Sequence, residues 1–268
     1  MAGMEAPLID FKNITVIKGK NQKVLDSVSL KIAEGENVAI LGPNGAGKSS
    51  LIKVITRQYY PIPSENCSFK IWGRQTWDVF DLRSLLGIVS NDLQYDCNRD
   101  ITGMEVILSG FFSSIGLFNE HITTAMRKKA EGVIDFLEIG HLKDRTINYM
   151  SSGEARRFLI GRALVHDPKA LILDEPTNSL DLHALYKFTS ILEKIVKRGT
   201  SIILVTHHLS DIIPAIKRVI LMKDGRLFLD GPKEDVLTQG HISKLFDTPI
   251  EIVAKYGYYY ALRGHFSK

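Results

Sequence analysis

The chain has 268 residues, of which 44% are hydrophobic and 24% are charged, and its formal net charge is +4. These are ordinary values for a globular protein, and the longest Lys/Arg run is only Arg127–Lys128–Lys129, so no nucleic-acid partner is expected. Cys67 and Cys97 form neither a metal-ligand nor a redox spacing. No segment approaches the ~18–20 apolar residues that span a bilayer, and the N-terminus lacks the features of a secretory signal. Any membrane role is therefore expected to come through a partner.

The first half of the chain alternates strand and helix signals. Residues 11–16 and 24–32 show the period-two apolar spacing of half-buried strands. Residues 37–41 predict a short buried strand that runs into a glycine-rich turn, and residues 50–57 carry a helical apolar stripe. Another short strand is predicted around residues 88–89.

The second half begins with a helical stretch over residues 98–149, followed by a helix after residue 154 and a strand at 170–173. A further helix carries Leu185, Phe188, Leu192 and Ile195 on one face, and a buried strand follows at 201–206. Asp224-Gly225 between two apolar runs predicts a hairpin turn. This alternation predicts an α/β fold with a largely parallel sheet covered by helices.

Residues 42–49, GPNGAGKS, match the phosphate-loop pattern G-x-x-x-x-G-K-[ST] between a strand and a helix. Its glycines permit backbone angles that let successive N–H groups converge on phosphate oxygens, and the helix start adds its positive dipole end. Lys48 is expected to reach the β- and γ-phosphates, and the Ser49 hydroxyl to bind Mg²⁺. The alternative is a glycine-rich turn without a ligand.

Two acids, Asp174 and Glu175, end the strand at 170–173. One carboxylate can hold the water shell of Mg²⁺, and the next can orient the attacking water as a general base. A general base typically accelerates a reaction by a factor of ~10²–10⁴. His207 follows the strand at 201–206 and could donate to a γ-phosphate. Separately these residues are ordinary strand ends, but together with the phosphate loop they predict a nucleotide-hydrolysing site.

The stretch MSSGE, residues 150–154, opens a helix that is predicted to run to about Val165. Ser151 and Glu154 fit a capping box. The small residues Ser152 and Gly153 leave the helix N-terminus bare, and a bare N-terminus is an anion site. The capping box and the anion site are compatible interpretations, because the capped helix start is itself the anion site.

These motifs, in this order and spacing, resemble those of ATP-binding cassette (ABC) ATPases, the nucleotide-binding subunits of ABC transporters. GPNGAGKS resembles the Walker A loop, LILDE the Walker B strand with its catalytic glutamate, and MSSGE the family signature. Residues 179–181 resemble the D-loop, and His207 the switch histidine. The resemblance covers residues 11–237.

The resemblance implies a P-loop NTPase core, with a mostly parallel sheet covered on both faces by helices, an N-terminal antiparallel β subdomain and a helical signature subdomain. It implies one cassette domain over residues 1–241, with the helical subdomain inserted at about 98–165, and a C-terminal extension over residues 242–268.

In the family, two domains pair head to tail, and ATP lies between the Walker A loop of one and the signature helix of the other. The resemblance therefore implies that Glu175 and His207 are catalytic and that Mg²⁺ is held through Ser49, Asp174 and Asn91. The residues that it places on ATP are Gly42, Pro43, Asn44, Gly45, Ala46, Gly47, Lys48, Ser49, Ser50, Asn91, Ser151, Ser152, Gly153, Glu154 and Asp181.

The chain departs from the family pattern at three places. Ser152 and Glu154 stand where the signature usually has Gly and Gln, and Glu154 brings a negative charge near a triphosphate. Asn91 stands in place of the usual Q-loop glutamine and is one methylene shorter, although Gln94 lies nearby. Residues 15–23 contain no aromatic side chain to stack on adenine.

The resemblance implies a Mg²⁺-dependent ATPase that closes on ATP with a second copy of itself, on the cytoplasmic face of a membrane. It would drive transport through separate transmembrane permease subunits, with a substrate-binding protein as a further partner. The C-terminal arrangement resembles importer subunits for metal chelates or oxyanions. The alternatives are a soluble single-cassette ABC ATPase that serves as an assembly factor, and an ATP-dependent regulator with little turnover.

Overall fold

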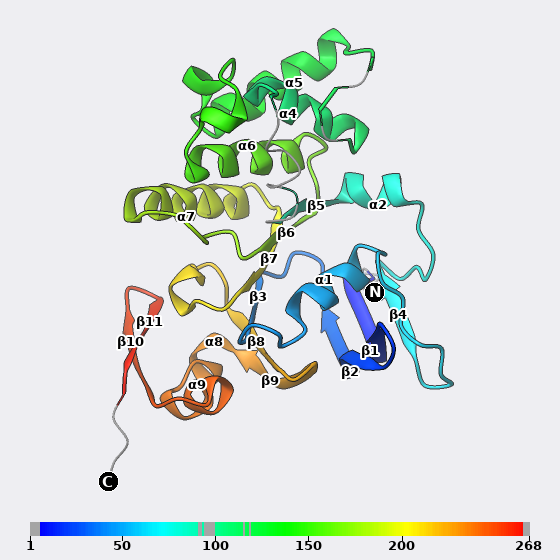
Figure 1. The fold of residues 1–268 in the computed structure, drawn as a ribbon, viewed down its shortest axis with the longest axis vertical. Helices are drawn as coiled ribbons and strands as arrows, with labels where there is room; N and C mark the ends of the chain where they lie inside the picture. The colour runs from blue at the N-terminus through cyan, green and yellow to red at the C-terminus, as the bar shows by residue number, and fades with distance from the viewer. Residues whose placement is uncertain (1–5, 91–92, 94–99, 115, 118, 265–268) are drawn as a thin grey trace, which may run out of the picture. The chain divides into compact units, whose positions relative to one another are not determined.

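The computed structural model describes residues 6–90, 93, 100–114, 116–117 and 119–264 (Figure 1). Its chain divides into two compact units, one made of Met1–Val79 with Ser201–Lys268 and the other of Phe80–Thr200. Each unit has strands and a buried core of its own. The domain boundaries expected from the sequence, at residue 241 and at about 98–165, stay predictions.

The first unit contains a three-stranded antiparallel sheet in the order β2-β1-β4. Strand β1 (Ile9–Lys18) pairs with β2 (Gln22–Ile32) and with β4 (Ser68–Ile71). Buried and more exposed residues alternate along much of β1 and β2, which is why the sequence predicted both strands. Strand β4 was missed, because four residues carry too little periodicity. The expected antiparallel β subdomain is confirmed.

Four more strands of the first unit lie in the order β7-β3-β8-β9. Strand β3 (Val38–Leu41) runs parallel to β7 (Ser201–Thr206) and to β8 (Arg218–Lys223). Every residue of β3 and β7 is buried, as expected for parallel strands covered on both faces. Strand β9 (Arg226–Pro232) returns antiparallel from β8.

Two local predictions in this unit are confirmed. Helix α1 (Lys48–Ile55) follows β3 and buries the stripe Leu51, Ile52, Val54 and Ile55. Asp224 and Gly225 link β8 to β9 with φ of 49° and 74°, and two positive φ angles are the mark of a tight hairpin turn.

The C-terminal part of the first unit consists of α8 (Lys233–Val236), α9 (Gln239–Phe246) and the hairpin of β10 (Ile250–Lys255) and β11 (Tyr258–Arg263). Most side chains of these two strands are exposed. Tyr259 is the aromatic residue of the hairpin that is buried, at 9% exposure.

The second unit begins at Phe80, the second residue of α2 (Val79–Leu85), and continues with a parallel pair of strands, β5 (Leu86–Val89) and β6 (Ala170–Asp174). Between these strands the chain forms α4 (Gly103–Ser109) and α5 (Thr124–Phe136). The stretch predicted as helical is therefore only partly so, and short 3₁₀ helices interrupt it at Gly110–Phe112, Gly140–Leu142 and Ile147–Tyr149.

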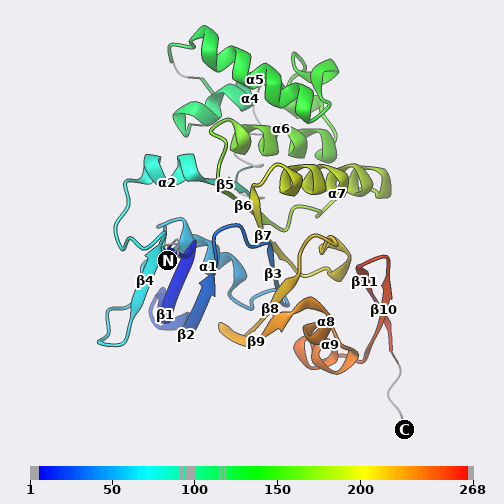
Figure 2. The same cartoon turned by 180° about the vertical axis from the view of Figure 1, so that it is seen from behind.

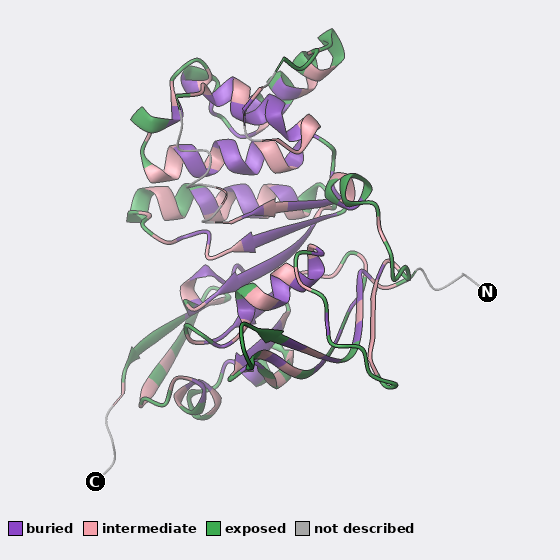
Figure 3. Cartoon of the chain, turned by 45° about the vertical axis from the view of Figure 1, so that its right-hand side comes forward, coloured by how far each residue is buried: buried purple, intermediate pink, exposed green. Residues whose placement is uncertain are grey.

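Helices α6 (Ser152–Leu164) and α7 (Leu182–Lys197) complete the second unit. In both views α6 lies between α4 and α7 (Figure 1 and Figure 2). The buried sides of α6 and α7 are visible in Figure 3, and they include Phe158, Leu192 and Ile195 at 0–1% exposure. Among the described residues, none of the helices combines the length and the apolar character that crossing a membrane requires.

Candidate functional site

The phosphate loop, residues 42–49, lies in the first unit between β3 and α1. Gly47 is the N-cap of α1 with φ of 98°, and a Cβ atom there would stand 2.7 Å from the backbone oxygen of Val24. A Cβ atom at Gly42 would stand 2.3 Å from the backbone oxygen of Met222. Both positions therefore accept only glycine, and the loop is held close to the surrounding backbone.

Lys48 lies over this loop and is only 5% exposed. Its Nζ donates to the carbonyl oxygens of Gly42, at 2.7 Å, and Pro43, at 3.0 Å. The start of α1 has no acidic residue in its first turn and no side-chain cap, so its N–H groups and dipole favour an anion. The loop thus combines an ammonium group with a bare helix N-terminus, which suits a phosphate group.

The remaining residues of the phosphate loop lie around the start of helix α1. Asn44, Gly45 and Ser49 are exposed, and Pro43 and Ser50 are half-buried. Ala46 is 2% exposed and anchors the loop, because Gly225 N–H donates to its carbonyl oxygen at 3.1 Å. The side chain that could bind a cation, Ser49, is therefore accessible at the start of α1.

His207 follows β7 at the same edge as the phosphate loop. Leu41 and Thr206 are register partners of the parallel strands β3 and β7, and Gly42 N–H donates to the Thr206 oxygen at 3.4 Å. The turn after β7 is fixed because the Thr206 hydroxyl donates to the carboxylate of Asp211 and accepts from His208 N–H at 3.0 Å. His207 therefore follows β7 at the point where the neighbouring strand β3 runs into the phosphate loop.

Asp174 is the last residue of β6 in the second unit and Glu175 follows it directly; both are half-buried. Glu175 has φ of 47°, in the left-handed region that few residues other than glycine adopt. The Nδ2 group of Asn178 donates to its Oε2 atom at 2.8 Å. Sequence reasoning missed Asn178, and the only signal was an amide side chain three residues after an acid.

The helix start at residues 150–154 is the capping box that the sequence predicted. Glu154 N–H donates to Ser151 Oγ at 3.3 Å, and Ser151 N–H donates to Glu154 Oε2 at 2.8 Å. The helix begins at Ser152 and its C-cap is Val165, as expected. The backbone hydrogen bond from Ser151 is the main cause that lowers the pKa of Glu154 below its ordinary value. Glu154 is therefore an ionised carboxylate at neutral pH.

Gly153 is small for a reason that the sequence did not reveal. A Cβ atom at this position would stand 2.7 Å from the Cβ atom of Ala184 on α7. The same helix α7 begins at Asp181, whose Oδ1 accepts from Ala184 N–H at 2.7 Å. The second unit thus packs the start of α6 against the start of α7. Gly153 has no side chain and therefore permits this close approach.

The residues expected to hold Mg²⁺ are suitable in chemistry. Ser49 contributes a hydroxyl and Asp174 a carboxylate, and oxygen ligands of this kind are those that Mg²⁺ prefers. Asn91, the third expected ligand, and Gln94 lie outside the described residues.

Comparison with known proteins places these motifs in a family. A protein-family model described as ABC transporter matches residues 25–178. The uncharacterized ABC transporter ATP-binding protein YlmA of Bacillus subtilis (strain 168) is 34% identical over 251 residues, which cover 92% of this chain and 93% of that protein. The hemin import ATP-binding protein HmuV of Bradyrhizobium diazoefficiens is 29% identical over 237 residues, which cover 84% of this chain and 83% of the relative.

A solved structure agrees with the fold. The dimeric structure of MJ0796, a bacterial ABC transporter cassette, aligns with a TM-score of 0.69 at 26% identity and covers 84% of this chain and 98% of its own. The expected ABC ATPase fold is thereby confirmed. The chain therefore belongs to the ABC transporter family and is an ATP-binding, ATP-hydrolysing subunit.

Proposed function

We propose that two copies of this chain close head to tail around two ATP molecules, and that the closure drives transport through separate membrane subunits. In this arrangement the phosphate loop of one copy and the signature helix of the other hold the same ATP. The observation that supports the proposal is that one chain offers two helix N-termini suited to a phosphate: that of α1, which has no side-chain cap and carries Lys48, and that of α6, which begins with the small residues Ser152 and Gly153 beside its capping box.

Each residue has a defined task in this mechanism. The loop N–H groups and Lys48 bind the β- and γ-phosphates, and Lys48 exchanges its bonds to Gly42 and Pro43 for phosphate oxygens. Ser49 and Asp174 would hold Mg²⁺, which neutralises phosphate charge when bound. Glu175 accepts a proton from the attacking water, and Asn178 fixes the direction of its carboxylate. His207 donates a hydrogen bond to the γ-phosphate.

Closure follows from differential binding. The signature helix contacts the γ-phosphate only across the interface, so ATP binds the closed pair more tightly than the open one. Glu154 adds a negative charge at this point, but its carboxylate is turned back to Ser151 N–H at 2.8 Å and lies in the field of a helix N-terminus. We therefore expect closure to be weakened by Glu154 but retained.

The proposed transport role is supported by the names of the related proteins, which are ATP-binding proteins of transporters. Because one relative is a hemin import ATP-binding protein, we propose import of a metal chelate as the transported substrate class. The partners would be transmembrane permease subunits and a substrate-binding protein, with this subunit at the cytoplasmic face of the membrane. The cassette would comprise residues 1–241, and residues 242–268 would be an extension.

Two experiments test the proposal. Glu175→Gln should retain ATP binding but not hydrolysis, so it should sediment as a dimer with ATP and Mg²⁺ and as a monomer without them. The matched control is Glu175→Gln combined with Lys48→Ala, which should stay monomeric with ATP. A Glu175→Gln variant that stays monomeric in saturating ATP contradicts the closure mechanism.

The transport role is tested by gentle detergent extraction of native membranes, followed by purification of the tagged chain. The expected result is co-purification of an integral membrane protein that raises the ATPase rate. An active ATPase recovered wholly from the cytosol, with no membrane partner, would refute the transport role and favour the soluble assembly factor.

A further inference from the structure

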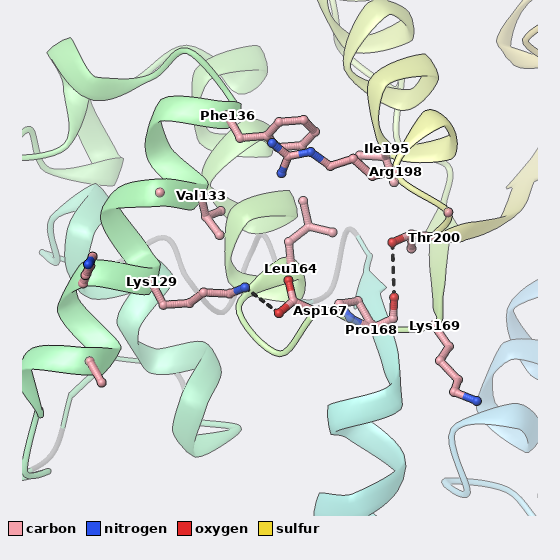
Figure 4. Close-up of a pocket in the computed structure, with 14 residues that line it drawn as sticks. Lys129, Val133, Phe136, Leu164, Asp167, Pro168, Lys169, Ile195, Arg198 and Thr200 are labelled. Atoms are coloured by element: carbon pink, nitrogen blue, oxygen red, sulfur yellow. Dashed lines mark hydrogen bonds and ion pairs between the residues drawn. The ribbon is translucent and has the colours of Figure 1, made fainter.

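A pocket of about 930 Å³ lies in the second unit, away from the motifs described so far (Figure 4). Three segments form it: α5, the loop that follows α6, and the end of α7. Its volume lies within the range of ~300–1,000 Å³ that is usual for small-molecule sites. The signature start, Ser152, and the pocket residue Leu164 are at opposite ends of α6, about 18 Å apart along the helix. The pocket is therefore separate from the signature.

The floor of the pocket is apolar. Val133, Leu164 and Ile195 contribute to it and are 7%, 8% and 1% exposed. Gly132 on α5 also lines the pocket, and a Cβ atom built on it meets nothing within 4 Å. The apolar floor can therefore accept an aliphatic or aromatic body, and the space beside Gly132 is open.

The rim is cationic. Lys128, Lys129, Lys169 and Arg198 line the pocket, and Asp167 is the one carboxylate among the lining residues. Lys129 pairs with Asp167, as the dashed line in Figure 4 marks. The Lys169 side chain runs away from the pocket in Figure 4, so the other three cations and the one carboxylate give a net charge of two positive. Helices α5, α6 and α7 all end at the pocket, and their C-termini together oppose this by about one and a half units of negative charge. The balance stays slightly positive, so the field at the pocket favours an anion.

Arg198 is the cation best prepared for a ligand. Its guanidinium carbon lies 3.4 Å from the centroid of the Phe136 ring, so the planar group is stacked on an aromatic face (Figure 4). Stacking fixes the plane of the guanidinium while its N–H groups point outward from its edge. Within the described part of the chain, neither Arg198 nor Lys128 forms an ion pair. The acids of α5, Glu131 and Asp135, are not among the lining residues.

We infer that this pocket binds a small amphipathic organic anion, whose apolar body rests on Val133, Leu164 and Ile195 and whose carboxylate or phosphate group is held by Arg198 at the rim. A fixed guanidinium above an apolar floor provides the two contacts that such a molecule needs. Size favours this ligand over a protein segment, because a volume of about 930 Å³ lies within the range of ~300–1,000 Å³ that is usual for small-molecule sites.

Paired fluorescent probes test the inference on the intact chain with saturating ATP present. Anilinonaphthalene sulfonate carries an apolar body and an anionic group, and N-phenylnaphthylamine is its uncharged counterpart. We expect saturable binding of the sulfonate at one site. Arg198→Ala should weaken it about tenfold or more, as expected for the loss of a charge-assisted hydrogen bond. Lys197→Ala, the neighbouring cation outside the pocket lining, should leave it unchanged.

A second pair of variants locates the probe. Gly132→Phe places a ring in the open space of the pocket and should abolish binding of both probes, whereas Gly240→Phe, at another helical glycine with open space around it, should not. Decanoate or decyl phosphate should displace the sulfonate, and decanol should not; the two anions distinguish a carboxylate ligand from a phosphate ligand. Binding that survives Gly132→Phe, equal losses of both probes in Arg198→Ala, or equal displacement by decanol would overturn the inference.

Discussion

Gly153→Ala tests the packing at the start of the signature helix. The added Cβ atom would stand 2.7 Å from the Cβ atom of Ala184, whereas carbon atoms in contact are normally ~3.5–4.0 Å apart. Helices α6 and α7 must therefore separate by about an ångström. Overpacking of this kind typically costs ~1–3 kcal/mol, and the helix propensity of alanine returns at most ~1 kcal/mol. We expect a net loss of about 1–2 kcal/mol in the free energy of unfolding.

A double-mutant cycle measured by urea denaturation isolates this contact. Ala184→Gly alone should cost up to ~1 kcal/mol through helix propensity. Combined with Gly153→Ala it should remove the clash, so the double variant should be more stable than the sum of the single changes by at least ~1 kcal/mol. Gly240→Ala in α9, where a Cβ atom meets nothing within 4 Å, is the control and should be neutral or stabilising. Strictly additive single effects would refute the proposed contact between Gly153 and Ala184.

Three further predictions concern side chains around the site. Ser151→Ala should lower the free energy of unfolding by ~1 kcal/mol, because the N–H of Glu154 loses its acceptor; an unchanged urea midpoint would count against the cap. Because the folded pKa of Glu154 is lowered, its stabilising effect is complete above its ordinary pKa of about 4.3 and is lost as the pH falls through the folded value. The difference in Tm between the wild type and Glu154→Gln should therefore stay constant from about pH 7 to 5 and shrink below about pH 4. A difference that grows below about pH 4 would mean that folding raises the pKa of Glu154 and would contradict this prediction. Asn178→Ala should reduce kcat about tenfold with little change in KM for ATP, since the Glu175 carboxylate loses a 2.8 Å hydrogen bond; an equal rise in KM would point to a binding role instead.

Local chemistry explains what the sequence could predict. Strand β7 was placed at its observed bounds, Ser201–Thr206, because all six residues are buried and a polar turn follows. The capping box was recognised from Ser151 and Glu154 because both partners lie within one helical turn. The hairpin at Asp224-Gly225 likewise depends on two adjacent residues.

Contacts between distant residues explain what the sequence could not predict. Strand β4 is stabilised by pairing with β1, for example Ile9 with Ile71, which lie 62 positions apart in the printed sequence. The reason for Gly153 is Ala184, on another helix. Arg198 and Phe136 come from two helices, so neither their stacking nor the pocket beside them has a signature in either segment alone.

The central claim, that each ATP lies between two copies, is tested by mixing two inactive variants. Lys48→Ala disables the phosphate loop, and Ser152→Glu places a carboxylate at the signature start, where the helix dipole tolerates it but a triphosphate does not. In a head-to-tail pair the mixed dimer keeps one intact site. The ATPase rate of an equal mixture should therefore rise well above that of either variant, toward about a quarter of the wild-type rate. A mixture no more active than the separate variants would contradict the shared site.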